Sequence, residues 1–147
     1  MQIPHNAHVL VADGRKMLFF RNEGDGEYPN LKVENHREEY NPPHREQATD
    51  SSGRAAVPAG AAGGGSMEEV DFHQQEEDRF AAEAAELLKK KALNHEIEHL
   101  IIVAPPKTLG EMRKHYHKEV EQRIAGEIPK DLTNMPVPEI ERAIQEA

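Results

Sequence analysis

The sequence predicts one α/β domain built on a mixed β-sheet with helices on both faces. Three patterns predict this fold class: two apolar runs around an Asp-Gly pair near the start, a continuous apolar run at residues 100–104, and helical apolar spacing on either side of that run. The expected element order is β-β-β, a long loop, and then α-β-α-β-α. Because the chain has 147 residues, residues 1–147 fit a single domain with a modest core.

The first two strands are predicted to form a β-hairpin. Residues 9–12 (VLVA) and 17–20 (MLFF) are apolar, and Asp13 and Gly14 between them tolerate the positive φ that a tight turn requires. Residues 31–35 (LKVEN) alternate in polarity after a turn rich in Gly and Asp, which favours a third strand with one buried face.

Residues 41–66 are predicted to form a flexible loop. They are rich in Gly, Pro and Ser, and Val57 is the only large aliphatic residue among them, so they offer little apolar surface to offset the entropy of ordering. The glycine-rich part, residues 60–65, has two interpretations. It is either a flexible linker, which we favour, or a phosphate cradle made of backbone N–H groups that lead into a helix.

Five further elements are expected after the loop. Residues 68–93 show one apolar helical face, with acidic residues in the first half and lysines in the last turns, as the helix dipole favours. Residues 100–104 (LIIVA) are typical of a central strand that is covered on both faces. A second helix is expected from Thr108, as its N-cap, through residue 124, followed by an edge strand at 128–132 and a closing helix at 138–147.

The composition disfavours several classes of protein. A formal net charge of -9 opposes non-specific attraction to phosphates, which argues against a DNA-binding domain. The chain has no cysteine, so disulfides and thiolate sites are excluded. No signal sequence or membrane-length apolar run is visible, so we expect a cytoplasmic protein without membrane insertion. The sequence does not indicate an oligomeric state.

The segment from His95 to His99 (HEIEH) matches the HExxH pattern of zinc proteases. That chemistry needs both histidines on one face of a continuing helix. Here His99 runs directly into the predicted strand at residues 100–104, so the two imidazoles should not share a helical face. We therefore expect no metal site at this motif.

A small basic strip is the candidate contact with nucleic acid. It consists of Arg113, Lys114, His117 and Lys118. Such a strip on an acidic protein is suited to rRNA or tRNA phosphate. The other interpretation, which we favour, is an ordinary solvated helix face that is balanced by Glu111, Glu119 and Glu121.

Three aspartates, Asp13, Asp50 and Asp131, are candidates for acid/base work or for holding Mg²⁺. Each also has a plain structural role in a turn, a loop or a strand end. The sequence names no catalytic pair among them, and we expect no catalytic residue, metal or cofactor.

Several segments spread in order over nearly the whole chain carry a family resemblance. They are VLVADGRK at 9–16, TDSSGR at 49–54, DFH at 71–73, EEDRF at 76–80, VAPP at 103–106 with LG at 109–110, Glu127, and KDLT at 130–133. On these residues the chain resembles the bacterial host-attachment protein family, the proteins required for attachment to host cells. That family is related to the middle domain of archaeal and eukaryotic peptide-release factors.

The resemblance implies a release-factor middle-domain-like fold, in which a glycine-rich loop precedes a long helix. Gly63, Gly64, Gly65 and Ser66 occupy the position of the Gly-Gly-Gln loop of release factors. In those proteins the glutamine places a water molecule at the peptidyl-tRNA ester. This chain has Gly65 and Ser66 where the glutamine would lie, so the release mechanism does not carry over with the fold.

Three functions follow as expectations. The preferred one is a non-enzymatic release-factor-like binding module that associates with ribosomes or tRNA-bearing complexes. The alternative is a hydrolase of an ester or phosphoester at residues 60–66, with Ser66 or an aspartate in place of the glutamine. The third takes the family name literally, as a protein that supports attachment to a host cell, and it requires export.

Overall fold

The protein is described by a computed structural model that covers residues 1–38 and 62–147. The elements follow in the order β1 (His8–Ala12), β2 (Lys16–Asn22), β3 (Leu31–Glu38), α2 (Ala62–Leu93), β4 (Leu100–Val103), α3 (Pro106–Arg113), α4 (Lys118–Glu121), β5 (Ile124–Ile128) and α5 (Val137–Glu146). Most of the predicted long loop, residues 41–61, lies outside the described residues.

The five strands form one mixed sheet in the order β3-β2-β1-β4-β5. β1 pairs antiparallel with β2, and β2 with β3, whereas β1 and β4, and β4 and β5, are parallel. The predicted hairpin, the third strand and the central strand at residues 100–104 are therefore confirmed. The α/β fold class with a mixed sheet is confirmed as well.

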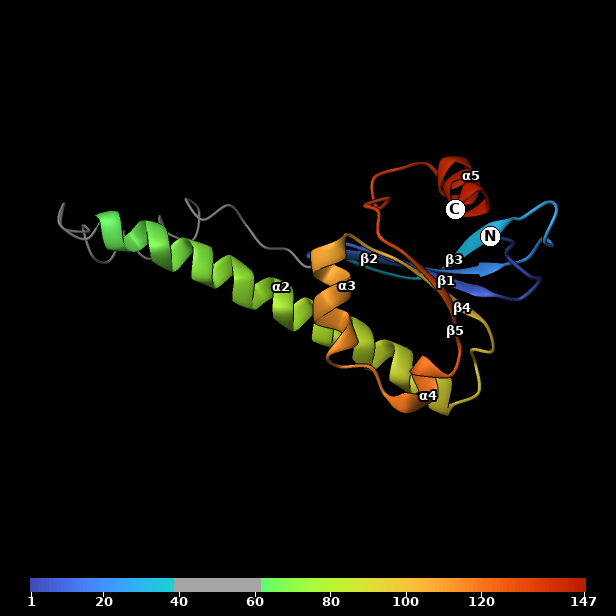
Figure 1. The fold of residues 1–147 in the computed structure, drawn as a ribbon, viewed down its shortest axis with the longest axis horizontal. Helices are drawn as coiled ribbons and strands as arrows, with labels where there is room; N and C mark the ends of the chain where they lie inside the picture. The colour runs from blue at the N-terminus through green and yellow to red at the C-terminus, as the bar shows by residue number, and fades with distance from the viewer. Residues whose placement is uncertain (39–61) are drawn as a thin grey trace.

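Helices cover both faces of this sheet (Figure 1). Alternate residues of the central strands face opposite ways, so Leu10 and Ile102 pack in the core layer that contains α2, α3 and α4. Val9 and Ile101 pack in the second layer, beneath α5. Both faces of β1 and β4 are buried, which explains why these strands are continuously apolar in sequence.

A buried asparagine organises the turn between β2 and β3. Asn22 is fully buried and donates from Nδ2 to the Ile3 carbonyl oxygen at 2.7 Å. Its Oδ1 accepts from the backbone N–H groups of Gly24 and Asn30 at 2.9 and 2.8 Å. A Cβ at Gly24 would lie 2.1 Å from the Tyr28 carbonyl oxygen, so this tight turn requires glycine.

The long helix begins earlier than expected. α2 starts at Ala62 and not near Glu68, so Gly63, Gly64, Gly65 and Ser66 lie within the helix and not in a loop before it. Glycine costs only about 1 kcal/mol per residue in a helix relative to alanine, and elongation from an existing helix avoids the cost of a new nucleus. Glycine-rich sequence alone therefore does not stop a helix.

The predicted second helix, from Thr108 through residue 124, is wrong. α3 ends at Arg113, the four-residue α4 follows separately, and Ile124 begins β5. The five apolar residues at helical spacing do pack in one core layer: Leu109, Met112, Tyr116, Val120 and Ile124. The helical spacing therefore shows that these segments bury the same side of the chain, and it does not show that they form one continuous helix.

The ends of the elements in this half also differ from expectation. α3 begins at Pro106 with Pro105 at the N-cap, so Thr108 is not its N-cap. Proline suits the first helical position because its missing N–H would have no partner there. The predicted edge strand at residues 128–132 is replaced by β5, which ends at Ile128, immediately before Pro129. The closing helix is confirmed as α5.

Within the described ranges, 1–38 and 62–147, no helix combines the length and apolar character needed to cross a bilayer.

Truncating the centre of the sheet should test this packing. Ile102 is fully buried, so Ile102→Ala is expected to lower the free energy of unfolding by about 2–5 kcal/mol. Val33 is 52% exposed on the edge strand, and Val33→Ala should cost less than about 1 kcal/mol. Urea unfolding followed by circular dichroism measures both, and equal losses would contradict the assignment of β4 to the core.

Candidate functional site

The glycine tract lies at the far end of a projecting helix. The buried residues of α2 whose burial is described lie between Phe80 and Ala92. The N-terminal half of the helix runs beyond the edge of the sheet (Figure 1). With a rise of about 1.5 Å per residue, Ala62 lies about 27 Å from Phe80 along the helix axis. Gly63, Gly64, Gly65 and Ser66 are thus carried away from the core.

The predicted basic strip is divided and partly neutralised. Arg113 ends α3, and its Nη2 lies 3.2 Å from Oε1 of Glu127 on β5. The Nζ of Lys114 lies 3.0 Å from Oε1 of Glu111. Exposed pairs of this kind contribute little to stability, but they reduce the local positive charge.

The other half of the strip belongs to a different element. His117 is the N-cap of α4, and its Nδ1 accepts the backbone N–H of Glu119 at 3.0 Å. Lys118 is the first residue of α4. Because α3 ends at Arg113, the four residues do not form the continuous helical strip that their spacing suggested.

Two of the three candidate aspartates meet at one threonine. Oγ1 of the buried Thr133 lies 2.8 Å from Oδ2 of Asp13 and 2.9 Å from Oδ1 of Asp131. Asp13 also accepts the backbone N–H groups of Arg15 and Lys16, each at 2.7 Å. These hydrogen bonds connect the β1–β2 turn to the segment after β5, so Asp13 and Asp131 have a structural role. Asp50 lies outside the described residues.

The HExxH segment does not lie on a helix. α2 ends at Leu93, and His95 has a positive φ of 60° in the turn that follows. The sequence-based prediction that His95 and His99 do not share a helical face is confirmed. Among residues 1–38 and 62–147, no group of three or more His, Asp or Glu side chains has the geometry of a metal site.

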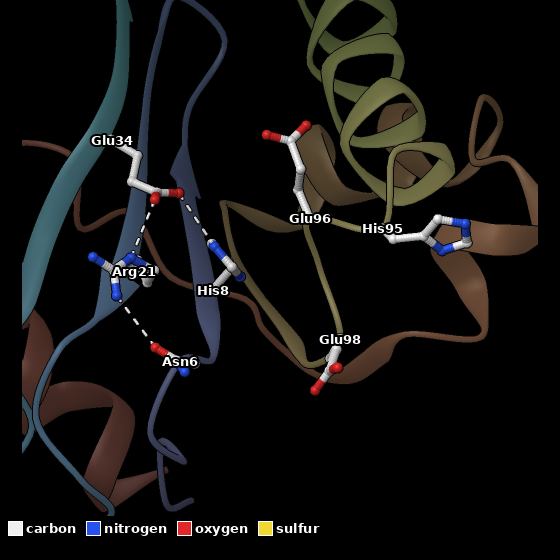
Figure 2. A pocket seen from close by; sticks show the side chains of 7 residues that line it. All are labelled: Asn6, His8, Arg21, Glu34, His95, Glu96 and Glu98. Carbon is white, nitrogen blue, oxygen red and sulfur yellow. Dashed lines mark hydrogen bonds and ion pairs between the residues drawn. The ribbon is translucent and has the colours of Figure 1, made fainter.

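A cavity of about 400 Å³ opens between the sheet and this turn. It is lined by Asn6, His8, Arg21, Glu34, His95, Glu96 and Glu98. Figure 2 shows His8, Arg21 and Glu34 on the side of the sheet, with Glu96 and Glu98 on the segment opposite and the ring of His95 pointing away from His8. The volume lies in the range of small-molecule sites.

His8 forms the most buried part of the cavity wall. Its residue surface is only 6% exposed, and its ring stacks on Phe19 with centroids 5.2 Å apart. Its Nε2 lies 3.2 Å from Oε1 of Glu34. Burial lowers the pKa of His8 below its usual value, although the Glu34 carboxylate acts in the opposite direction. Burial thus favours the neutral ring near pH 7, and in that ring Nε2–H is the group positioned to donate to Glu34.

Arg21 holds the carboxylate that binds His8. Its Nε donates to Oε2 of Glu34 at 3.2 Å, and its Nη1 donates to Oδ1 of Asn6, also at 3.2 Å. Its Nη2 forms an ion pair with Glu23 at 3.0 Å. The β1–β2 register pairs His8 with Arg21, which brings these groups together.

Sequence reasoning missed this cavity. His8 is the first residue of the apolar strand β1, and a histidine in that position is normally interpreted as a core residue. The other lining residues come from the N-terminal segment, β2, β3 and the turn before β4. No local spacing connects these segments, so only strand pairing could have shown the cluster.

The buried histidine predicts a pH-dependent stability. Because the folded pKa of His8 lies below 6.5, the unfolded chain takes up a proton first as the pH falls, and the stability of the fold decreases below that pH. His8→Phe keeps a stacked ring and removes the titrating group. Urea unfolding from about pH 7.5 to about pH 5 should show a smaller loss of stability in His8→Phe than in the wild type. An identical loss in both proteins would show that His8 does not titrate with folding.

Comparison with known proteins places these features in a family. A family model described as bacterial archaeo-eukaryotic release factor family 12 matches residues 6–144. No curated protein matches the sequence.

Proposed function

We propose that this chain, which belongs to bacterial archaeo-eukaryotic release factor family 12, is a non-enzymatic binding module that associates in the cytoplasm with ribosomes or tRNA-bearing complexes. Family membership supports a role related to translation. It does not decide the chemistry, because a function depends on the residues of a site and not on the fold alone.

The projecting part of α2 is the observation that carries the proposal. A helix that extends past its own core presents surface that the domain does not need for packing. The glycines near its N-terminus have no side chains, so the backbone there can approach a ribose-phosphate chain closely. The N–H groups in the first turn of a helix have no partner within the helix and suit an anionic partner, despite the net charge of -9.

The absence of a glutamine supports binding without hydrolysis. Gly65 and Ser66 stand where the resemblance places the catalytic glutamine, and both lie within α2. The hydrolase alternative requires Ser66 or an aspartate to activate water at this position. Incubation with peptidyl-tRNA tests it directly, and ester cleavage above background would replace the binding proposal with the enzymatic one.

A link to host attachment is compatible with this proposal as an indirect effect. Cell fractionation distinguishes the two routes, because a direct adhesin must reach the cell surface. Exclusively cytosolic protein would leave only the indirect role.

Sedimentation with ribosomes across a salt series tests the binding proposal. Tagged full-length protein should enter the ribosomal fractions at low salt and leave them as the salt concentration rises, because phosphate contacts depend on counterion release. Protein that stays entirely in the light fractions at low salt would rule the proposal out.

Alanine substitutions identify the surface that makes the contact. Replacing Gly63, Gly64 and Gly65 together by alanine should favour the helix but reduce co-sedimentation, because the added methyl groups hold the backbone away from RNA. Gly110→Ala is a matched control, since a Cβ at this α3 glycine meets nothing within 4 Å. Equal binding by the triple variant and the wild type would show that the glycines do not contact the ribosome.

A further inference from the structure

We propose that the cavity between the start of β1 and the turn before β4 binds a small organic cation that carries an ammonium or guanidinium group. This inference does not depend on ribosome binding. It rests on a buried acceptor without a partner, on the charge of the cavity lining and on the backbone conformation of its walls.

The acceptor is Nδ1 of His8. Because Nε2 donates to the Glu34 carboxylate, neutral His8 carries a lone pair on Nδ1. That atom is buried and has no hydrogen-bond partner among the residues that the structure describes. A buried acceptor without a donor destabilises a protein, so a ligand N–H that reached it would satisfy a group that the fold leaves open.

The charge of the lining favours a cation. Glu34, Glu96 and Glu98 contribute three carboxylates against the single guanidinium of Arg21, which leaves an excess of two negative charges apart from the histidines. Arg21 already contacts Glu34, Asn6 and Glu23. Glu96 and Glu98 are exposed and form no ion pair with another described residue, so their carboxylates are available to a ligand.

One further cation lies close to His8 on the α2 side. Nζ of Lys91 is 4.8 Å from the centroid of Phe19, the ring on which His8 stacks. Its charge opposes protonation of His8 and helps to keep Nδ1 an acceptor. Lys91 does not line the cavity, so it leaves the charge balance of the lining unchanged.

Two residues of the cavity lining have an unusual backbone conformation. Asn6 and His95 have φ values of 66° and 60°, and they are the two non-glycine residues with positive φ in the described chain. Such conformations cost free energy and tend to occur at functional sites. His8 is the least exposed residue of the cavity lining, and its Nδ1 is buried at this inner wall.

The size and ligand set distinguish an organic cation from a metal ion. About 400 Å³ is far larger than one ion requires. Within the described part of the chain, no three His, Asp or Glu side chains converge as a metal site. An extended cation with N–H donors fits the separated carboxylates better than a point charge.

Titration of the full-length, isotopically labelled protein with putrescine and with methylguanidinium tests the proposal by NMR. Saturable shifts of the amides of His8, Glu34 and Glu98 are expected, with affinity in the millimolar range or tighter. Mg²⁺ provides the comparison with a simple charge, and it should not produce saturable shifts at the same amides. The proposal would be overturned if neither organic cation produced saturable shifts, or if Mg²⁺ produced equal shifts at the same amides.

Three variants separate binding from folding. Glu98→Gln removes an exposed carboxylate and should weaken binding roughly tenfold without changing stability. Glu121→Gln, on α4 and outside the cavity, is the matched control and should bind as the wild type does. His8→Phe removes the acceptor and should weaken binding while remaining folded. Equal weakening by Glu98→Gln and Glu121→Gln would show non-specific attraction and contradict the proposed site.

Discussion

The parallel pairing of β1 with β4 is the interaction on which the rest of the structure depends. Val9, Leu10 and Val11 align with Ile101, Ile102 and Val103 across that pair, and all six side chains are buried. One face of the pair receives α2 and the other receives α5. The same pairing fixes both ends of β1, with the cavity beside His8 at one end and the Asp13–Thr133 contact near the other. A parallel connection needs a long crossover, which α2 supplies.

The elements that the sequence predicted well are those with local signals. The hairpin has an Asp-Gly turn between two apolar runs, and β4 is a short run that is apolar throughout because it is covered on both faces. The missed elements lacked such signals. Residues 109–124 keep an apolar spacing through two helices and into a strand because all of these pieces pack against the same core layer. Spacing reports which side of the chain is buried, but it does not report where the backbone turns.

The candidate sites show a similar limit. The basic strip appeared cationic because its carboxylate partners are not all neighbours in sequence: Glu127 reaches Arg113 from another element. The cavity around His8 was invisible for the same reason, since the β1–β2 register supplies Arg21 and the turn before β4 supplies Glu98. The position of the glycine tract followed from family resemblance, yet its helical conformation did not. Membership in the release-factor family is shown for residues 6–144, and the two proposals concern particular residues on α2 and around His8.

Native-state hydrogen exchange tests the central claim most directly, because it reports the stability of each strand separately. If β1 and β4 form the doubly covered centre, the amides of Leu10 and Ile102 exchange only through global unfolding. Their exchange free energy then equals the unfolding free energy from urea denaturation, and amides on the outer edge of β3 exchange faster. Exchange at Leu10 and Ile102 as fast as at that edge would contradict the account.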